Sequence, residues 1–253
     1  MMDLRLGRYQ DVLGDVTCDM VALDAPYSAK THVGHRGSAG IVKDTGWVRS
    51  NGKIDVASVR KDIDYAAWGR DEIAECADFW AHRCRGWFVT ITDDVLAPIW
   101  AGELERTGRY VFAPLPYVAT GSRVRLTGDG PSSWTCWIVV ARPKTQAFSR
   151  WGTLDGAYIL PPGYAERGLV TGSKPSWLMR ALIRDYSRPG DLVCDPCAGG
   201  ATTLLAAAQT GRRGVGSEMD PVTHAKAQKR LRDTPVAVDW LDTAPKGEQG
   251  GLW

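Results

Sequence analysis

The chain of 253 residues has no long hydrophobic run, little net charge and only four histidines. No apolar stretch approaches the roughly 20 residues that a membrane helix needs. The start, Met1–Arg5, lacks the pattern of a signal peptide. We therefore expect no membrane association and a cytoplasmic location. The net charge of +2 gives no overall signal for binding a polyanion.

The six cysteines do not have the spacing of a zinc site. Cys194 and Cys197 form a C-x-x-C pair, but no second pair completes four ligands. A thioredoxin-like motif is an alternative, although a small buried residue in a strand is the better interpretation of Cys194. His32 and His35 have Gly, Lys and Arg nearby, so we expect loop residues and no metal.

Two segments are locally basic. Residues 28–61 hold seven Lys and Arg against two Asp, and residues 142–188 hold eight against three acidic residues. They can line a groove for phosphates or form solvated faces, and composition favours neither. Residues 28–61 are also rich in Gly and Ser without clean periodicity, which predicts a long, mobile loop.

Hydrophobic periodicity predicts alternating strands and helices in one domain, residues 1–253. This pattern predicts an α/β fold, with a seven-stranded, mostly parallel sheet and helices on both faces. Ligands of such sheets bind beyond the carboxyl ends of the strands. We expect strands at 20–23, 87–92, 109–113, 134–141, 192–195, 214–218 and 236–238, and helices at 71–83, 95–106, 175–186, 201–210 and 221–231.

A glycine-containing turn follows the strand that ends at Asp195. It lacks the Gly-Lys-Ser/Thr of a P-loop and the G-x-G-x-x-G of a dinucleotide fold. Gly199 and Gly200 allow a ligand to approach the backbone at the start of the next helix. Glu218 lies 23 positions after Asp195, near the offset at which an acid binds ribose hydroxyls. The pattern predicts a nucleoside site, over which Lys174 could close.

A second acidic strand end is followed by Ala25, Pro26 and Tyr27. Pro26 favours an extended Ala25, which can aim the Ala25 carbonyl beside the Asp24 carboxylate. Two acceptors and the flat face of Tyr27 suit a planar group that carries an amine. Taken alone, the segment is better interpreted as an ordinary turn at the end of a strand. Asp93, like Asp24, follows a predicted strand.

Together the two motifs resemble the amino methyltransferases that use S-adenosylmethionine to modify adenine N6 or cytosine N4 in DNA. The family's clamp, Asp/Asn/Ser-Pro-Pro-Tyr/Trp, is matched by residues 24–27, and its Asp-Pro-Phe-x-Gly-Ser-Gly-Thr-Thr motif by residues 195–203. Its Lys-Pro-x-x-Leu segment is matched by residues 174–178, before Pro-Gly-Asp at 189–191. The motif order is similar to the permuted beta arrangement.

The resemblance implies S-adenosylmethionine as cofactor and a flipped base of DNA as substrate, adenine N6 before cytosine N4, with RNA not excluded. It also implies a small target-recognition insert at 144–173, which contains Trp151, Tyr158 and Tyr164. So small an insert suits a short or single-stranded target, or help from residues 28–61 or from a second subunit in a homodimer. The implied catalytic residues are Asp24, Ala25, Pro26 and Tyr27, and the implied cofactor-binding residues are Lys174, Asp195, Pro196, Cys197, Ala198, Gly199, Thr202, Thr203 and Glu218.

Three positions depart from the family pattern: Cys197 replaces Phe, Ala201 replaces Gly and Ala25 replaces Pro. The first two are expected to weaken cofactor binding, and they keep open a non-catalytic nucleic-acid-binding relative. The third leaves a backbone carbonyl in the clamp. A nicotinamide oxidoreductase is disfavoured because its fingerprint is absent. A cytosine-C5 enzyme is disfavoured because Cys197 lies in the cofactor turn.

Overall fold

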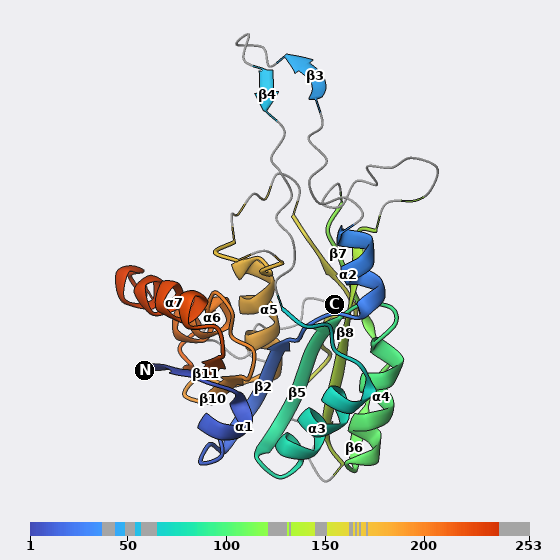
Figure 1. Cartoon of the computed structure of the whole chain (residues 1–253). Coiled ribbons are helices and arrows are strands. Elements are labelled where there is room, and N and C mark those ends of the chain that lie inside the picture. The colour runs from blue at the N-terminus through green and yellow to red at the C-terminus, as the bar shows by residue number, and fades with distance from the viewer. Residues whose placement is uncertain are drawn as a thin grey trace, which may run out of the picture.

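A nine-stranded sheet with helices on both faces forms the body of the protein (Figure 1). The computed structural model describes residues 1–36, 44–48, 54–56, 65–120, 131, 133–144, 151–161, 164, 166, 168–170 and 172–237. The strand order is β1-β11-β10-β2-β5-β8-β7-β9, and β6 pairs with β8. The strands are β1 (Met2–Leu6), β2 (Cys18–Asp24), β5 (Cys84–Thr92), β6 (Arg109–Val111), β7 (Leu115–Val118), β8 (Thr135–Pro143), β9 (Tyr158–Ile159), β10 (Leu192–Asp195) and β11 (Arg213–Glu218).

The strand order changes direction between β10 and β2. Strands β1, β11, β10, β2 and β5 are parallel neighbours, whereas β8 is antiparallel to β5. The chain moves from β2 outward to β5, and later from β10 outward to β11 on the other side. This is the topological switch point, beyond which parallel α/β sheets bind their ligands.

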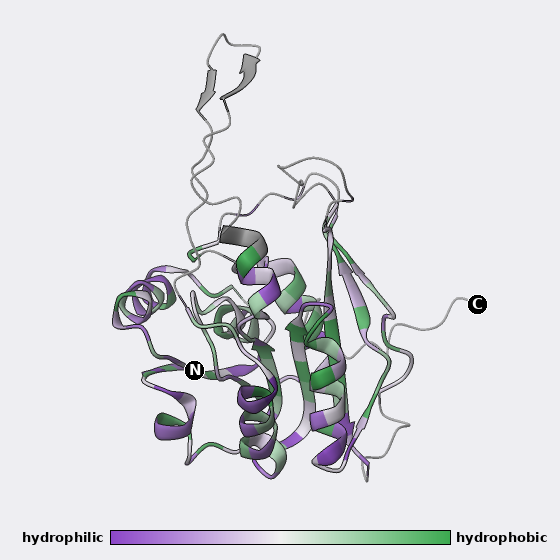
Figure 2. Cartoon of the chain, turned by 45° about the vertical axis from the view of Figure 1, so that its right-hand side comes forward, coloured by the Kyte–Doolittle hydropathy of each residue, from purple (hydrophilic) through white to green (hydrophobic). Residues whose placement is uncertain are grey.

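Both faces of the sheet are covered because its central strands alternate large apolar side chains between two cores. Val21 and Leu23 of β2 face the core beneath α3 (Arg70–Ala81) and α4 (Ala97–Arg106). Met20 and Ala22 face the opposite core beneath α5 (Ser176–Tyr186) and α6 (Thr202–Gln209). Helix α7 (Pro221–Asp233) packs beside β1. Figure 2 shows the hydrophobic strands between helices whose outer surfaces are hydrophilic.

The α/β class and the mostly parallel sheet are confirmed, but the strand count was too low. Six of the seven expected strands and all five expected helices are present. The short α1 (Tyr9–Val12) and three strands, β1, β7 and β9, were not expected. Residues 236–237 form no strand, and Val238 lies outside the described residues. β9 has two residues and β7 contains Pro116, so neither has a clear strand pattern.

In the described part of 28–61, where a long, mobile loop was expected, the chain forms a helix and a strand pair. Residues Ala29–Arg36 form helix α2, and β3 (Asp44–Val48) pairs antiparallel with β4 (Ile54–Val56) in a separate two-stranded sheet. His32 is buried in α2 and meets the Tyr65 ring edge-on at 5.3 Å, so it is no loop residue. Residues 37–43, 49–53 and 57–61 and the His35 side chain lie outside the described residues.

None of the six cysteines forms a disulfide, and Cys194 is fully buried in β10, as interpreted from the sequence. Among the described residues, no three potential ligands gather into a metal site. No helix in the described part of the chain has the length and apolarity to cross a membrane.

Candidate active site at the switch point

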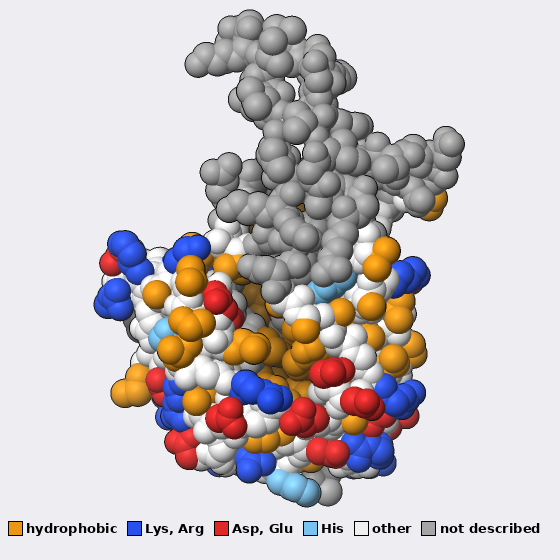
Figure 3. Space-filling view, in the orientation of Figure 1, with side chains coloured by type: hydrophobic (Ala, Val, Ile, Leu, Met, Phe, Trp, Pro, Cys, Tyr) orange, Lys and Arg blue, Asp and Glu red, His pale blue; other side chains and the backbone are white. Residues whose placement is uncertain are grey.

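The two predicted motifs lie on one edge of the sheet. Asp24 ends β2 and Asp195 ends the adjacent parallel strand β10, in which Cys194 pairs with Val21. Glu218 ends β11, the next strand along. Figure 3 shows a hollow with hydrophobic side chains on this face, between the α6–α7 side and the α4 side of the molecule. The fold thus brings Asp24 together with two acids that lie 171 and 194 positions later in the sequence.

Asp93, at the end of β5, anchors the segment that follows the clamp. Its Oδ2 accepts hydrogen bonds from the Ser28 N–H at 3.0 Å and from the hydroxyls of Ser28 and Thr31 at 2.5 and 2.6 Å. Its Oδ1 accepts from the Leu96 N–H at 3.0 Å, at the start of α4. Burial alone would raise the pKa of Asp93, but these hydrogen bonds outweigh it and hold the pKa below its ordinary value.

The anchor explains why the clamp backbone is well placed. Ala25 and Tyr27 are buried, Pro26 is half-buried, and the Tyr27 carbonyl accepts from the Trp68 N–H at 3.2 Å. Sequence reasoning noticed Asp93 as a strand end and missed Ser28 and Thr31. Their residue types were a usable signal, because the hydroxyls of Ser and Thr can donate hydrogen bonds to a carboxylate at a strand end.

Lys174 contacts the clamp, although the family resemblance placed it with the cofactor. Its Nζ lies 2.7 Å from Oδ1 and 2.9 Å from Oδ2 of Asp24, and it donates to the Gly172 carbonyl at 3.2 Å. The same nitrogen is 4.8 Å from the centre of the Tyr27 ring. The Lys174 side chain is 7% exposed and that of Asp24 is 22% exposed, so the ion pair is largely removed from water.

The turn after β10 is held by backbone contacts to β11. The Ala198 N–H donates to the Ser217 carbonyl at 2.9 Å, and the Ser217 hydroxyl donates to the Pro196 carbonyl at 2.8 Å. Glu218 accepts from the Gly199 N–H at 3.0 Å through Oε2, and from the Asp220 N–H at 2.8 Å through Oε1. Each oxygen of Glu218 retains a second lone pair, and the side chain is half-buried at the mouth of the turn.

Asp195 is 2% exposed at the base of the turn. Its Oδ1 accepts from the Cys197 N–H at 3.1 Å. Burial raises the pKa of Asp195 to about 7; hydrogen bonds from Thr203 and the Cys197 N–H oppose this effect, and Asp24 and Glu218 reinforce it. Thr202 and Thr203 are buried in the first turn of α6.

The two substitutions in this turn have different consequences. Ala201 has φ 58° and ψ 31°, a left-handed conformation that costs a non-glycine residue about 1–2 kcal/mol, so the family's Gly is the unstrained choice here. Cys197 is half-buried and packs against the core under α3. Burial raises the pKa of the Cys197 thiol, which keeps it neutral and unsuited to nucleophilic attack.

Arg230 of α7 is a site residue that the sequence reasoning missed. Its Nη1 donates to the Gly200 carbonyl at 2.7 Å and to the Thr202 hydroxyl at 2.9 Å, and its Nη2 lies 3.9 Å from Glu166. Glu166 in turn accepts from the Ser176 N–H at 2.7 Å, at the start of α5. The arginine therefore connects the cofactor turn to the approach segment, a contact for which the local sequence carries no signal.

The aromatic residues of the expected insert pack into the protein. Trp151 meets Trp87 edge-on at 5.4 Å, and the Arg188 guanidinium lies 3.7 Å from the Trp151 ring centre. Tyr158 is buried and donates to Asp185 at 2.7 Å, and Tyr164 donates to Glu166 at 2.6 Å. All three rings therefore contact other residues of the chain.

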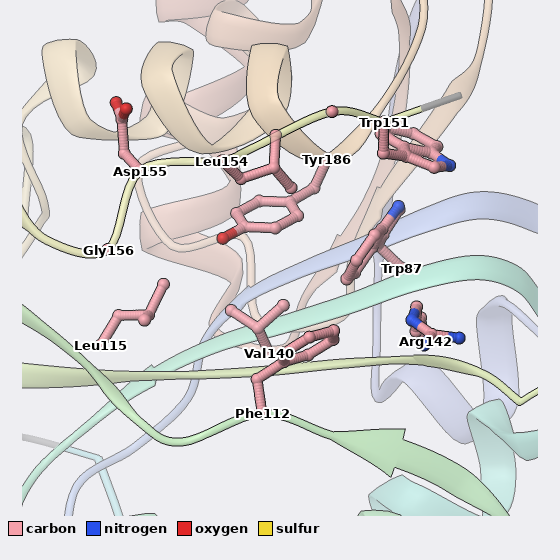
Figure 4. Close-up of a pocket in the computed structure, with 11 residues that line it drawn as sticks. Trp87, Phe112, Leu115, Val140, Arg142, Trp151, Leu154, Asp155, Gly156 and Tyr186 are labelled. Atoms are coloured by element: carbon pink, nitrogen blue, oxygen red, sulfur yellow. The ribbon is translucent and has the colours of Figure 1, made fainter. Parts of the chain in front are cut away.

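A cavity of about 300 Å³ lies away from the strand ends (Figure 4). Trp87, Trp151 and Tyr186 are among its walls, and Trp87 belongs to the amino-terminal half of β5. None of the expected catalytic or cofactor-binding residues lines this cavity. The candidate site is therefore the crevice between Asp24 and the turn at residues 195–203.

Chemically, the crevice combines two functions. The glycine turn with Glu218 offers close backbone approach and a carboxylate for a diol, as a nucleoside requires. The clamp offers a carboxylate, a backbone segment aimed by Pro26 and a flat ring, as a planar amine requires. Their position on neighbouring strand ends allows a group to pass from one ligand to the other.

The comparisons with known proteins agree with this arrangement. A family model described as DNA methylase (N6/N4) matches residues 164–229, which include Lys174, the turn and Glu218. YubD of Escherichia coli (strain K12), which carries a provisional methylase name, is 40% identical over 58 residues. That match spans 23% of this chain and 26% of the relative, about a quarter of its length.

Solved structures match nearly the whole chain. The M1.HpyAVI–SAM complex has a TM-score of 0.65 and 18% identity, covering 91% of this chain and 99% of that chain. The PvuII DNA methyltransferase, named as cytosine-N4-specific, has a TM-score of 0.62 and 12% identity, covering 92% of this chain and 87% of its own. At these identities the matches establish the fold.

Proposed function

Because residues 164–229 match the DNA methylase (N6/N4) family model and the chain shares the fold of the M1.HpyAVI and PvuII DNA methyltransferase structures, we propose that it methylates the exocyclic amine of a DNA base. The observation that supports this proposal most directly is that Asp24 and Asp195 end adjacent strands at the switch point. The methyl donor is S-adenosylmethionine, and the favoured substrate atom is adenine N6.

The residues of the turn fit this cofactor. Gly199 has φ 49°, which a glycine adopts without strain, and Glu218 presents a half-buried carboxylate at the strand end for the ribose hydroxyls. Asp195 and the buried threonines of α6 support the turn from below. When bound, the cofactor supplies an electrophilic methyl group on a sulfonium. Lys174, Pro196, Cys197 and Ala198 complete the proposed set of cofactor-binding residues.

The clamp acts on the acceptor amine. Its nitrogen is a poor nucleophile because the lone pair is delocalised into the ring of the base. Asp24 and the Ala25 carbonyl accept its two hydrogens, which favours a pyramidal nitrogen, and Tyr27 stacks on the base. Transfer of the methyl group would replace one amine proton, and the Asp24 carboxylate is placed to accept that proton. Rate enhancement comes from positioning and from fixed dipoles.

The preference for adenine over cytosine depends on the aspartate at position 24, which resembles the clamp of adenine enzymes more than a serine does. Cytosine N4 is the alternative, and PvuII DNA methyltransferase, a structural neighbour, is named for that activity. The target base lies inside a duplex and has to be flipped outward, unless the substrate is single-stranded. RNA is an alternative substrate of the same chemistry.

The decisive experiment is mass spectrometry of DNA nucleosides after incubation with the protein and isotopically labelled S-adenosylmethionine. We expect labelled N6-methyladenine. Labelled N4-methylcytosine would move the assignment to the alternative base. Unmodified DNA despite cofactor binding would contradict the proposal.

Asp24→Ala tests whether Asp24 serves methyl transfer without contributing to cofactor binding. We expect it to abolish methyl transfer because the clamp loses its charged acceptor, while cofactor affinity measured by calorimetry stays within a few-fold. A parallel loss of both properties would show that Asp24 serves the cofactor as well as the base.

A non-catalytic nucleic-acid-binding protein is the second candidate, favoured by the left-handed Ala201 in the cofactor turn. It predicts calorimetric titrations without S-adenosylmethionine binding, alongside retained DNA binding. Measurable cofactor affinity would exclude this candidate.

A further inference from the structure

The Lys174 ammonium occupies the position that the clamp offers to a substrate amine. It lies within hydrogen-bond distance of both Asp24 oxygens and above the face of Tyr27, which are the two features expected to hold the base. Its third donor reaches the Gly172 carbonyl. All three N–H groups of the ammonium therefore have acceptors, and the side chain fills the clamp.

This arrangement is strong because both partners are charged and largely buried. Charge-assisted hydrogen bonds are shorter and stronger than neutral ones, and 2.7 and 2.9 Å are typical of them. An exocyclic amine of a base is neutral and offers only two N–H groups. To donate to Asp24 while stacked on Tyr27, the amine needs the space that the ammonium fills, so the base and Lys174 compete for one position.

We propose that Lys174 is an internal occupant of the base clamp and that the target base must displace it before transfer. The inference rests on the proposed function and assigns to Lys174 a role in substrate entry. The approach segment allows the movement, since Gly172 has φ 86° and Lys174 precedes α5 without belonging to it. Displacement requires rotation of one side chain, while Asp93 keeps the clamp backbone in place.

The consequence is a lower apparent affinity for DNA. If the clamp is open in only a fraction of molecules, the apparent affinity for the base is reduced by that fraction. The occupant also keeps the Asp24 carboxylate paired while no base is present. Bases that cannot fill the clamp with an amine would fail to displace the ammonium, so the ion pair would favour amine-bearing bases.

The kinetic test compares Lys174→Met with Lys30→Met. The control lysine is exposed on the same edge of the sheet, where it pairs with Asp94 at 3.2 Å. We expect Lys174→Met to lower the KM for DNA by about tenfold at saturating S-adenosylmethionine, as expected for an open fraction near one tenth. Lys30→Met should leave the KM unchanged or raise it. An unchanged or raised KM for Lys174→Met would overturn the proposal.

A labelling test uses the wild-type protein and does not depend on the stability of a variant. Acetic anhydride is applied to the protein alone, and to the protein with oligonucleotide DNA and S-adenosylhomocysteine, and lysine acetylation is measured by peptide mass spectrometry. We expect Lys174 to be protected in the free protein and to react several-fold faster in the complex, whereas Lys30 should not accelerate. Continued protection of Lys174 in that complex, with an oligonucleotide that is methylated when S-adenosylmethionine is supplied instead, would overturn the proposal.

The two tests separate this inference from the function on which it rests. If the wild-type protein transfers no methyl group to any nucleic acid, the proposed function fails. If transfer occurs and Lys174 stays on Asp24 throughout, the function stands and only the role assigned to Lys174 is wrong.

Discussion

At the scale of single residues, the site depends on how carboxylates are partnered. Asp24 is paired with Lys174, Asp93 accepts hydroxyl and backbone donors, and Asp195 is buried close to other acids. Asp24 and Asp195 end their strands and Asp93 directly follows β5, all on one sheet edge, yet the three acids have different hydrogen-bond partners and different burial. Their environments, which the sequence does not display, separate them.

Asp195→Asn tests the raised pKa of this buried acid. Because the folded-state pKa of about 7 lies above the unfolded value of 3.8, the stabilising contribution of the protonated acid is complete below about pH 4. It is lost as the pH rises through 7. The amide does not titrate, so the variant should gain about 2 kcal/mol relative to wild type between pH 5.5 and 8.0.

Urea unfolding at the two pH values measures this difference. Asp94→Asn, an amide substitution at an exposed position of the same edge, is the control. A variant-to-wild-type difference that stays constant with pH would show that Asp195 titrates in its ordinary range.

At the scale of elements, the helices and strands form as their side-chain periodicity predicts. Helix α5 places Leu178, Leu182 and Ile183 in one core, and β2 alternates between two cores. The prediction failed for elements with weak patterns, such as two-residue β9 and helix α2. Helix α2 has no acidic residue in its first turn, and its sequence, AKTHVGHR, has no clear apolar stripe. Tertiary contacts such as the hydrogen bond from Thr31 to Asp93 therefore have to stabilise it.

Gly86→Ala tests the pairing of β2 with β5. A Cβ at residue 86 would lie 2.1 Å from the Asp19 carbonyl oxygen, where the register between the strands shifts. Backbone atoms would have to move, so we expect a loss of several kcal/mol in the free energy of unfolding. Thermal unfolding measured by circular dichroism would report it.

Gly102→Ala is the matched control within α4. A Cβ there meets nothing within 4 Å, and the residue is exposed in a helix, so alanine should stabilise the protein by about 0.5–1 kcal/mol. Equal effects of the two alanines would mean that the strand contact tolerates a side chain.

At the scale of the whole molecule, the cofactor turn is held by segments distant in sequence. Arg230 of α7 joins Gly200 to Glu166, and Glu166 caps the helix that follows Lys174. Leu169 also lies against the turn, because a Cβ at Gly200 would be 3.0 Å from the Leu169 Cβ. The approach segment, the turn and the last helix therefore form one unit, and the family model matches it as far as residue 229, next to Arg230.

Arg230→Met tests this unit. Loss of two hydrogen bonds to the turn should reduce affinity for S-adenosylmethionine about tenfold, because the turn is less well ordered before binding. Calorimetry measures the change. Lys229→Met, next in the helix, removes an exposed lysine paired with Asp233 and should leave the affinity unchanged. The same affinity in both variants would show that the turn does not need the arginine.

The sequence by itself determined the α/β class, the main strands and helices, and the residues that meet at the switch point. These follow from local periodicity and from motifs whose spacing is set by a strand followed by a turn and a helix. Only the tertiary structure decided that Lys174 lies on Asp24, that Asp93 anchors Ser28 and that Arg230 supports the turn. These contacts join side chains far apart in the chain, and their partners are chosen by distance and burial after folding, which no local pattern encodes.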